Sequence, residues 1–205
     1  MTLQSEITVC IPAHPARVAN GMLNRAIESI CNQHLPAAAI SIAVDLRGEG
    51  AARTRQRALT AVRTGWVAFL DSDDWFYPEH LEVLAAAALA HRADYVFSYY
   101  TIHMKNGDPI AGDPLGHFGR RFNPASPHQT TITTLVRTEL AQSVGFHDPP
   151  EGELINGQRY GEDFQFTLGC VNAGANIVHI PRRTWAWVHH GHNTSGLPTQ
   201  GDARS

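Results

Sequence analysis

Strand-like and helix-like segments alternate along the first half of the chain, and this order restricts the possible folds more than any other feature. Four short apolar runs have the length of buried strands, and between them apolar residues recur at helical spacing. The strand-like runs are residues 7–11, 39–44, 66–70 and 94–100, and the helix-like segments are residues 23–30, 51–63 and 78–92. A β-α-β-α-β-α-β order predicts a mostly parallel α/β sheet with ligands at the carboxyl ends of its strands.

Composition excludes several classes of protein. The 205 residues are 43% apolar and 17% charged, which suits one compact soluble domain. The net charge of −3 offers no basic field for nucleic acid. We expect a cytoplasmic protein, because no stretch is long enough to cross a membrane and no signal-peptide pattern opens the chain. Cys10, Cys31 and Cys170 lack metal-type spacing, so we expect buried thiols.

An acidic cluster follows the third strand-like run. Asp71, Asp73 and Asp74 fall within four residues, with Ser72 between them. Like charges this close repel one another unless a cation or hydrogen-bond donors compensate. An Asp-x-Asp at a strand end suits Mg²⁺ or Mn²⁺, which take one or two carboxylates together with water and phosphate oxygens. The alternative is a solvated acidic turn that caps the helix expected near Pro78.

Three arginines in the preceding helix form a second candidate site. Arg53, Arg55 and Arg57 lie in its first two turns, where the positive end of the helix dipole disfavours cations. Glycines, free N–H groups and arginines together would seat a phosphate and reverse that sign. A soluble basic helix face is the alternative. Asp45 ends the second strand-like run and would lie at the same edge of the sheet.

The second half of the chain has longer loops. Residues 105–129 and 148–160 have no periodicity, and such loops often act as lids or binding elements. We expect a strand over residues 131–136, helices over 137–144 and from 161 onward, and two final strands over 176–180 and 184–189. Glu162 and Asp163 would open the second of these helices, where acidic residues are also common for purely structural reasons. The run His189, His190 and His192 suggests either a zinc site or a polar turn after an aromatic edge strand.

These segments together resemble the family-2 glycosyltransferases of GT-A fold, over residues 6–196. The resemblance rests on the order and spacing of several motifs. They are residues 7–12 followed by His14 and Arg17, residues 26–30 with Gln33, Asp45, residues 50–56 with Gln56 where the family usually has Asn, residues 69–74 followed by Pro78, residues 134–137 with 144–146, Gly161-Glu162-Asp163, and Trp187-x-x-His190-x-x-Asn193-x-Ser195.

The resemblance implies a GT-A type, Rossmann-like sandwich with a mostly parallel sheet and helices on both faces. It implies an inverting, metal-dependent transferase that moves one sugar from a nucleotide-diphosphate donor, most often a UDP-sugar, to an acceptor hydroxyl. Asp73, with Asp71 and His190, would hold Mn²⁺ or Mg²⁺, although His189 or His192 are alternatives to His190. Asp163 would be the general base, and Glu162 would position it or bind the acceptor. The donor would contact Pro12, His14, Arg17, Asp45, Arg53, Arg55, Asp71 and Ser72.

The chain is expected to form a single domain over residues 1–205. Residues 1–104 would be the nucleotide- and metal-binding half, residues 105–196 the acceptor-binding half, and residues 197–205 a mobile tail. Two other functions stay open: a degenerate GT-A domain that binds carbohydrate or a protein partner, and a sugar nucleotidyltransferase. The latter normally has a Gly-rich basic loop after its first strand, where this chain has Pro12-Ala13-His14-Pro15. The oligomeric state also stays open, because no exposed apolar stripe stands out in the sequence.

Overall fold

A central sheet of eight strands organises the computed structural model, which describes residues 6–104, 109–110, 113, 116–125, 127, 131–148 and 161–189. The strands are β1 (Ile7–Ala13), β2 (Ala39–Val44), β3 (Trp66–Phe69), β4 (Trp75–Phe76), β5 (Tyr95–Met104), β6 (Pro109–Ile110), β7 (Thr134–Arg137) and β8 (Ile177–His189). Their order is β2-β1-β3-β7-β5-β8-β4, and β6 pairs with β5. The pairs β1–β2, β1–β3 and β5–β8 are parallel.

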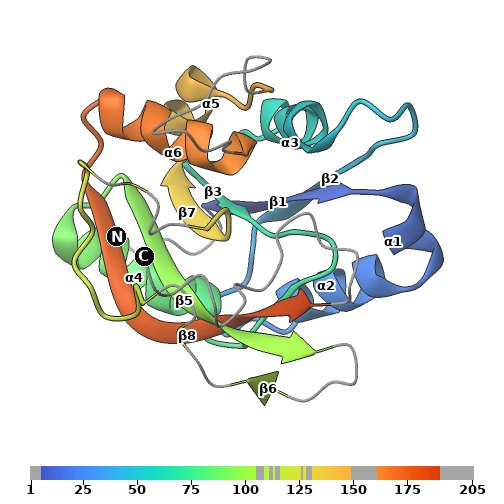
Figure 1. The fold of residues 1–205 in the computed structure, drawn as a ribbon, viewed down its shortest axis with the longest axis horizontal. Helices are drawn as coiled ribbons and strands as arrows, with labels where there is room; N and C mark the ends of the chain where they lie inside the picture. The colour runs from blue at the N-terminus through green and yellow to red at the C-terminus, as the bar shows by residue number, and fades with distance from the viewer. Residues whose placement is uncertain are drawn as a thin grey trace, which may run out of the picture.

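Helices cover both faces of this sheet, as Figure 1 shows with α3, α5 and α6 above it and α1 and α2 below it. The helices are α1 (Pro15–Ala19), α2 (Met22–Cys31), α3 (Ala51–Thr60), α4 (His80–His91), α5 (Thr138–Val144) and α6 (Glu162–Asn172). One apolar core lies between the sheet and α2 and α4, and includes Leu23 and Leu84. The other lies against α3, α5 and α6, and includes Leu59 and Phe166. The predicted α/β sandwich with helices on both faces is confirmed.

The sheet is less uniformly parallel than its alternating order predicts. β7 lies between β3 and β5 and is antiparallel to both. The strand of residues 131–136 was expected, but its position was not, since sequence order does not say which neighbours a late strand separates. β1, β2 and β3 remain parallel, so their carboxyl ends meet at one edge of the sheet.

Several boundaries differ from the predictions. The helix α4 begins at His80 with Glu79 as its N-cap, so Pro78 lies before the helix rather than in its first turn. The two expected final strands are one strand, β8, and Pro181 lies within it. Proline is tolerated there because β4 pairs with β8 only at Trp185 and Ala186. The short elements α1 and β4 were not predicted. Cys31 is exposed at the end of α2, whereas Cys10 and Cys170 are buried as expected.

None of the helices within the described residues is both long and apolar enough to cross a membrane.

Candidate active site

A cavity of about 910 Å³ lies at the carboxyl ends of β1, β2 and β3. Nearly all of the described residues that the sequence predicts for the site line it: Pro12, His14, Arg17, Asp45, Arg55, Asp71, Ser72, Asp73, Glu162 and Asp163. The rest of its lining is Ala13, Ala16, Gly50, Ala51, Thr54, Asp74, Ile132, Gly161 and Trp187. Residues from both halves of the sequence therefore form one cavity.

Arginines hold the acidic loop after β3 from two sides. The Nε atom of Arg17 lies 3.2 Å from Oδ2 of Asp73, and each of these side chains is 19% exposed. Arg25, from α2, donates from Nη2 to the Asp73 carbonyl over 2.8 Å, and its guanidinium lies 4.2 Å from the ring centroid of Trp75. These contacts fix the loop backbone and partly neutralise its charge.

Asp74 ties the same loop to β8. Its Oδ1 atom accepts a hydrogen bond from the Val188 amide over 2.8 Å, and the side chain is buried. Burial, reinforced by the charges of Asp73 and Asp71, raises the pKa of the Asp74 carboxyl well above its ordinary value. Asp74 is thus a structural carboxylate next to the two that face the cavity.

Arg55 joins the acidic loop to α6. Its Nη2 atom donates to Oδ1 of Asp71 over 2.7 Å, and its Nη1 atom donates to Oε1 of Glu162 over 2.6 Å. The side chain is only 4% exposed. Burial disfavours the cation, but the two carboxylates outweigh that effect and raise the pKa of the guanidinium. Arg55 therefore stays charged and holds two carboxylates of the candidate site that are far apart in sequence.

The amino end of α6 presents Glu162 and Asp163 to the cavity. Gly161 is the N-cap residue, and Oδ1 of Asp163 accepts from the Phe164 amide over 2.7 Å. A Cβ atom on Gly161 would lie only 2.8 Å from that oxygen, so glycine leaves the space the carboxylate occupies. Desolvation, and then the charge of Glu162, raise the pKa of Asp163. A carboxylate with a raised pKa is a stronger base than an ordinary one.

Three of the residues predicted to contact the nucleoside or the phosphates, Asp45, His14 and Arg53, differ in what they contact in the structure. Both carboxylate oxygens of Asp45 accept backbone hydrogen bonds, from Glu49 over 2.8 Å and Gly50 over 2.9 Å, so this side chain shapes the loop before α3. His14 caps α1 through Nδ1 at its edge of the cavity. Arg53 is not among the lining residues: its side chain is 68% exposed and pairs with Asp148 over 3.3 Å.

A divalent cation fits this site only together with further donors. Within the described ranges, no group of three or more His, Cys, Asp or Glu side chains is arranged to hold a metal. Asp71 and Asp73 do line the cavity together, and Mg²⁺ and Mn²⁺ commonly use one or two carboxylates with phosphate oxygens and water. The two carboxylates therefore suit a cation that arrives with a diphosphate. His190, the third predicted ligand, lies outside the described residues, as does most of the loop 148–160.

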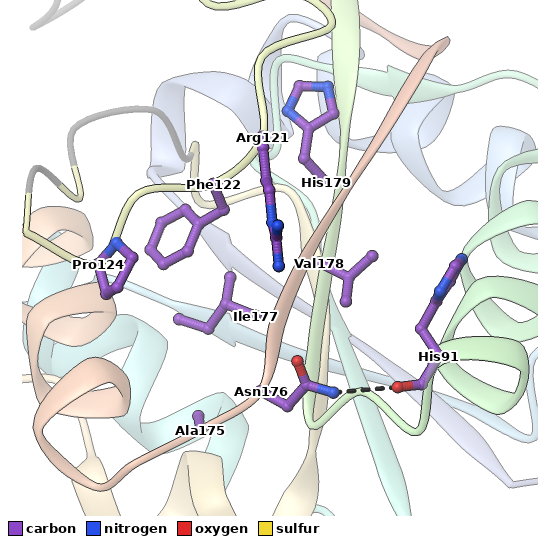
Figure 2. Close-up of a pocket in the computed structure, with 9 residues that line it drawn as sticks. All are labelled: His91, Arg121, Phe122, Pro124, Ala175, Asn176, Ile177, Val178 and His179. Atoms are coloured by element: carbon purple, nitrogen blue, oxygen red, sulfur yellow. Dashed lines mark hydrogen bonds between the residues drawn. The ribbon is translucent and has the colours of Figure 1, made fainter.

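A second cavity, of about 450 Å³, surrounds the start of β8. Figure 2 shows the side chain of Arg121 lying along this strand, with Phe122 and Val178 to either side of it. Asn176 donates from Nδ2 to the His91 carbonyl over 3.0 Å at its lower edge. None of the residues predicted for the site lines this cavity, and its described lining includes no carboxylate. Acid–base chemistry is therefore assigned to the larger cavity.

Sequence reasoning missed several residues of the site. Arg25 lies 48 residues before the carbonyl that it contacts, and no local pattern links the two. Thr54 lines the cavity, and its hydroxyl donates to the Gly50 carbonyl over 2.8 Å. Trp187 also lines the cavity, and its place in the C-terminal motif was the available signal.

Sequence comparison agrees with the fold. The model of glycosyl transferase family 2 matches residues 40–139, which include β2, β3, the acidic loop, α3 and β7. Over this segment, which is close to half of the chain, the sequence therefore matches glycosyltransferase family 2. No curated protein matches the sequence.

Solved structures similar to this chain include several of TarS of S. aureus. The structure of its residues 1–349 has a TM-score of 0.67 and 19% sequence identity to this chain, covering 89% of this chain and 60% of the other. The same fragment in complex with UDP-GlcNAc has a TM-score of 0.70 and 17% identity, covering 92% and 60%. A complex of that fragment with UDP has a TM-score of 0.66 and 18% identity, covering 90% and 60%. This chain thus spans about 60% of the length of these fragments and shares their fold.

Proposed function

We propose that this chain is a metal-dependent, inverting glycosyltransferase that transfers one sugar from a UDP-sugar to an acceptor hydroxyl. The observation that carries the proposal is that Asp71 and Asp73 line one cavity with Glu162 and Asp163, and that Arg55 bonds to a member of each pair. One pair suits a cation and a diphosphate, and the other suits proton transfer. The match of residues 40–139 to the model of glycosyl transferase family 2 supports the same reaction class.

The two halves of the chain supply different parts of this reaction. Residues 1–104 form the donor-binding half, with Pro12, His14 and Asp45 around the nucleoside and Arg17 beside the phosphates. Residues 105–196 form the acceptor-binding half, which contributes Ile132, Glu162 and Asp163 to the cavity. Arg53 is given no contact with the donor, because its side chain lies outside the cavity lining and forms a surface ion pair with Asp148.

Asp73 and Asp71 would hold Mn²⁺ or Mg²⁺, which when bound supplies a Lewis acid for the leaving diphosphate. Asp163 is the general base. Its carboxylate accepts the proton of the acceptor hydroxyl as the hydroxyl oxygen bonds to the anomeric carbon and the bond from that carbon to the diphosphate oxygen breaks. Glu162, fixed by Arg55, keeps the amino end of α6 beside the acidic loop.

UDP-GlcNAc is the first donor to test, because the similar TarS fragment was crystallised with it. We would incubate the protein with Mn²⁺ and UDP-GlcNAc, UDP-glucose, a GDP-sugar or a dTDP-sugar, without acceptor, and measure release of the nucleotide diphosphate. The same assay would use Asp73→Ala, Asp163→Asn and, as a matched control, Asp148→Asn, whose only described partner is Arg53 on the surface.

We expect slow hydrolysis of one donor, abolished by chelation and by Asp73→Ala, reduced at least about 100-fold by Asp163→Asn and unchanged in the control. Calorimetry with UDP and Mn²⁺ provides the second measurement. No binding of UDP or of any donor, with or without Mn²⁺, would refute the transferase and leave a domain that binds a different ligand. Binding and turnover that ignore Asp73→Ala would refute the metal role alone.

A further inference from the structure

The side chain of Gln56 makes one short hydrogen bond, and the bond is to a residue outside the cavity lining. From α3, its Oε1 atom accepts a hydrogen bond from the backbone amide of Phe146 over 2.7 Å. Its other polar atom, Nε2, reaches only the exposed hydroxyl of Thr60, over 3.5 Å. Gln56 is not among the residues that line the cavity. The main interaction of the Gln56 side chain is therefore with the turn that follows α5.

The turn that Gln56 holds presents one aromatic ring to the interior. Gly145 adopts a φ of 67°, a conformation that glycine accepts without strain, and the amide of the next residue then faces α3. The ring of Phe146 is 2% exposed and stacks on Phe166 of α6, with 4.3 Å between ring centroids and 15° between planes. It also meets the edge of Phe69, at the end of β3, with 5.2 Å between centroids. One ring thus contacts both of the elements that present the functional carboxylates.

The same ring supports Arg55. The guanidinium carbon of Arg55 lies 5.3 Å from the centroid of Phe146, within the range of a cation–π contact. The guanidinium in turn bonds to Asp71 and Glu162. A continuous series of contacts therefore leads from Gln56 through Phe146 to the guanidinium of Arg55, which lies between the two carboxylates.

We propose that Gln56 is a positioning residue for the transfer reaction: by holding the Phe146 amide it seats the ring under Arg55, and so fixes α6 and Asp163 relative to the acidic loop. The proposal rests on the proposed function for the identity of the reaction, although the contacts themselves do not. Gln56 touches neither substrate nor reacting atoms. Its effect reaches the chemistry through Arg55, whose charge stabilises the ionised form of Asp163.

A direct readout is the titration of Asp163, followed by NMR of protein labelled with ¹³C at its aspartate carboxyls and assigned with Asp163→Asn. Gln56→Met keeps the length and apolar bulk of the side chain but removes the acceptor. Phe146→Leu removes the ring and leaves Gln56 in place. Thr60→Val is the matched control, because it removes the weak contact of the same amide and spares the Phe146 bond. Should Gln56→Met fail to fold, Gln56→Asn, one methylene shorter, replaces it.

We expect Gln56→Met and Phe146→Leu each to raise the pKa of Asp163 by about half a unit or more, because Arg55 then lies less close to it. Thr60→Val should leave that pKa as in the unmodified protein. In donor hydrolysis, Gln56→Met should lower kcat about tenfold, with the acid limb of the pH profile displaced to higher pH. A residue that merely supports folding would lower the yield of active protein without moving the limb.

A folded Gln56→Met or Gln56→Asn variant with the Asp163 pKa of Thr60→Val would overturn the proposal. The titration requires no donor, so it separates the two proposals. If the unmodified protein binds no nucleotide and hydrolyses no sugar nucleotide while the pKa still moves, the proposed function fails and the link from Gln56 to Asp163 stands. If the protein hydrolyses a sugar nucleotide but the pKa of Asp163 does not change in the variants, the proposed function stands and the proposed role of Gln56 fails.

Discussion

Removal of the buried cation at Arg55 is the most direct test of how the site is built. Arg55→Leu keeps apolar bulk beneath the carboxylates and leaves Asp71 and Glu162 without the guanidinium that both now contact. Asp163, whose ionised form Arg55 also favours, loses the same support. Asp71, Glu162 and Asp163 would then lie at one edge of the cavity without the cation that now compensates their charge.

The size of the effect follows from burial. Breaking a buried ion pair by removing one partner costs about 3–5 kcal/mol, since an uncompensated charge is left behind. The Asp71 and Glu162 side chains are 35% and 22% exposed, so water replaces part of the loss and the lower end applies. About 3 kcal/mol at neutral pH corresponds to a fall in Tm of about 6–12 °C for a chain of this size.

The pH dependence of this loss identifies its cause. Burial raises the pKa values of Asp71 and Asp163, and the charge of Arg55 lowers them. The stabilising contribution of Arg55 is therefore present at neutral pH and lost as pH falls and these carboxyls protonate. Thermal unfolding, followed by circular dichroism at pH 7.5 and at about pH 4, should show a large difference from the unmodified protein only at the higher pH. Arg53→Leu is the matched control, because that arginine is 68% exposed and its pair with Asp148 contributes little. Equal losses at both pH values, or a loss no larger than that of the control, would refute the electrostatic reasoning.

Three further perturbations test other parts of the structure. Because the pKa of Asp74 is raised by burial, its contribution to stability is present below the ordinary aspartate pKa and lost as pH rises through the native value; Asp74→Asn should unfold like the unmodified protein near about pH 4 and about 2–4 °C higher at pH 8, by calorimetry. Gly161→Ala pushes a Cβ against the Asp163 carboxylate, so donor hydrolysis should fall about tenfold while Tm changes by less than about 2 °C; an unchanged rate would show that the carboxylate moves without consequence. Gly169→Ala places a Cβ 2.4 Å from Cγ1 of Val144, and urea unfolding should show a loss of about 1–3 kcal/mol that Val144→Ala added to it largely restores.

Local patterns in the sequence predict the elements of this fold better than their arrangement. The run of residues 39–44 is a strand with the expected bounds, and the helix of the arginines begins at Ala51 as expected. Periodicity and terminal residues decide such features, and both are local. The position of β7 between β3 and β5 depends on contacts between distant segments, and no window of sequence contains them.

In the candidate site, too, local features are predictable from the sequence and contacts between distant residues are not. That the acidic loop and the amino end of α6 carry the carboxylates of the candidate site is predictable, because strand ends and helix starts are recognisable in sequence. That Arg55 bonds to both is not, since its partners lie 16 and 107 residues away. The helix dipole favours an anion near the three arginines, and all three contact carboxylates of the protein itself: Arg55 those of the site, Arg57 that of Glu49 and Arg53 that of Asp148.

Because each motif is only a local pattern, each one also admits an ordinary structural interpretation. An Asp-x-Asp turn, an acidic helix start and an arginine-rich helix all occur in proteins without any catalytic function. Their combination differs, because a buried arginine that neutralises carboxylates from both ends of one cavity brings like charges together at a cost that a structural core would avoid. Had the acidic loop served only to cap α4, neither Asp71 nor Asp73 would need to be accessible from a cavity of about 910 Å³, yet their side chains are 35% and 19% exposed. Asp74 also lies at the cavity wall, but it is only 3% exposed and bonds to β8. The structure therefore separates one structural aspartate from two that a ligand can reach, in a cluster where the sequence treats all three alike.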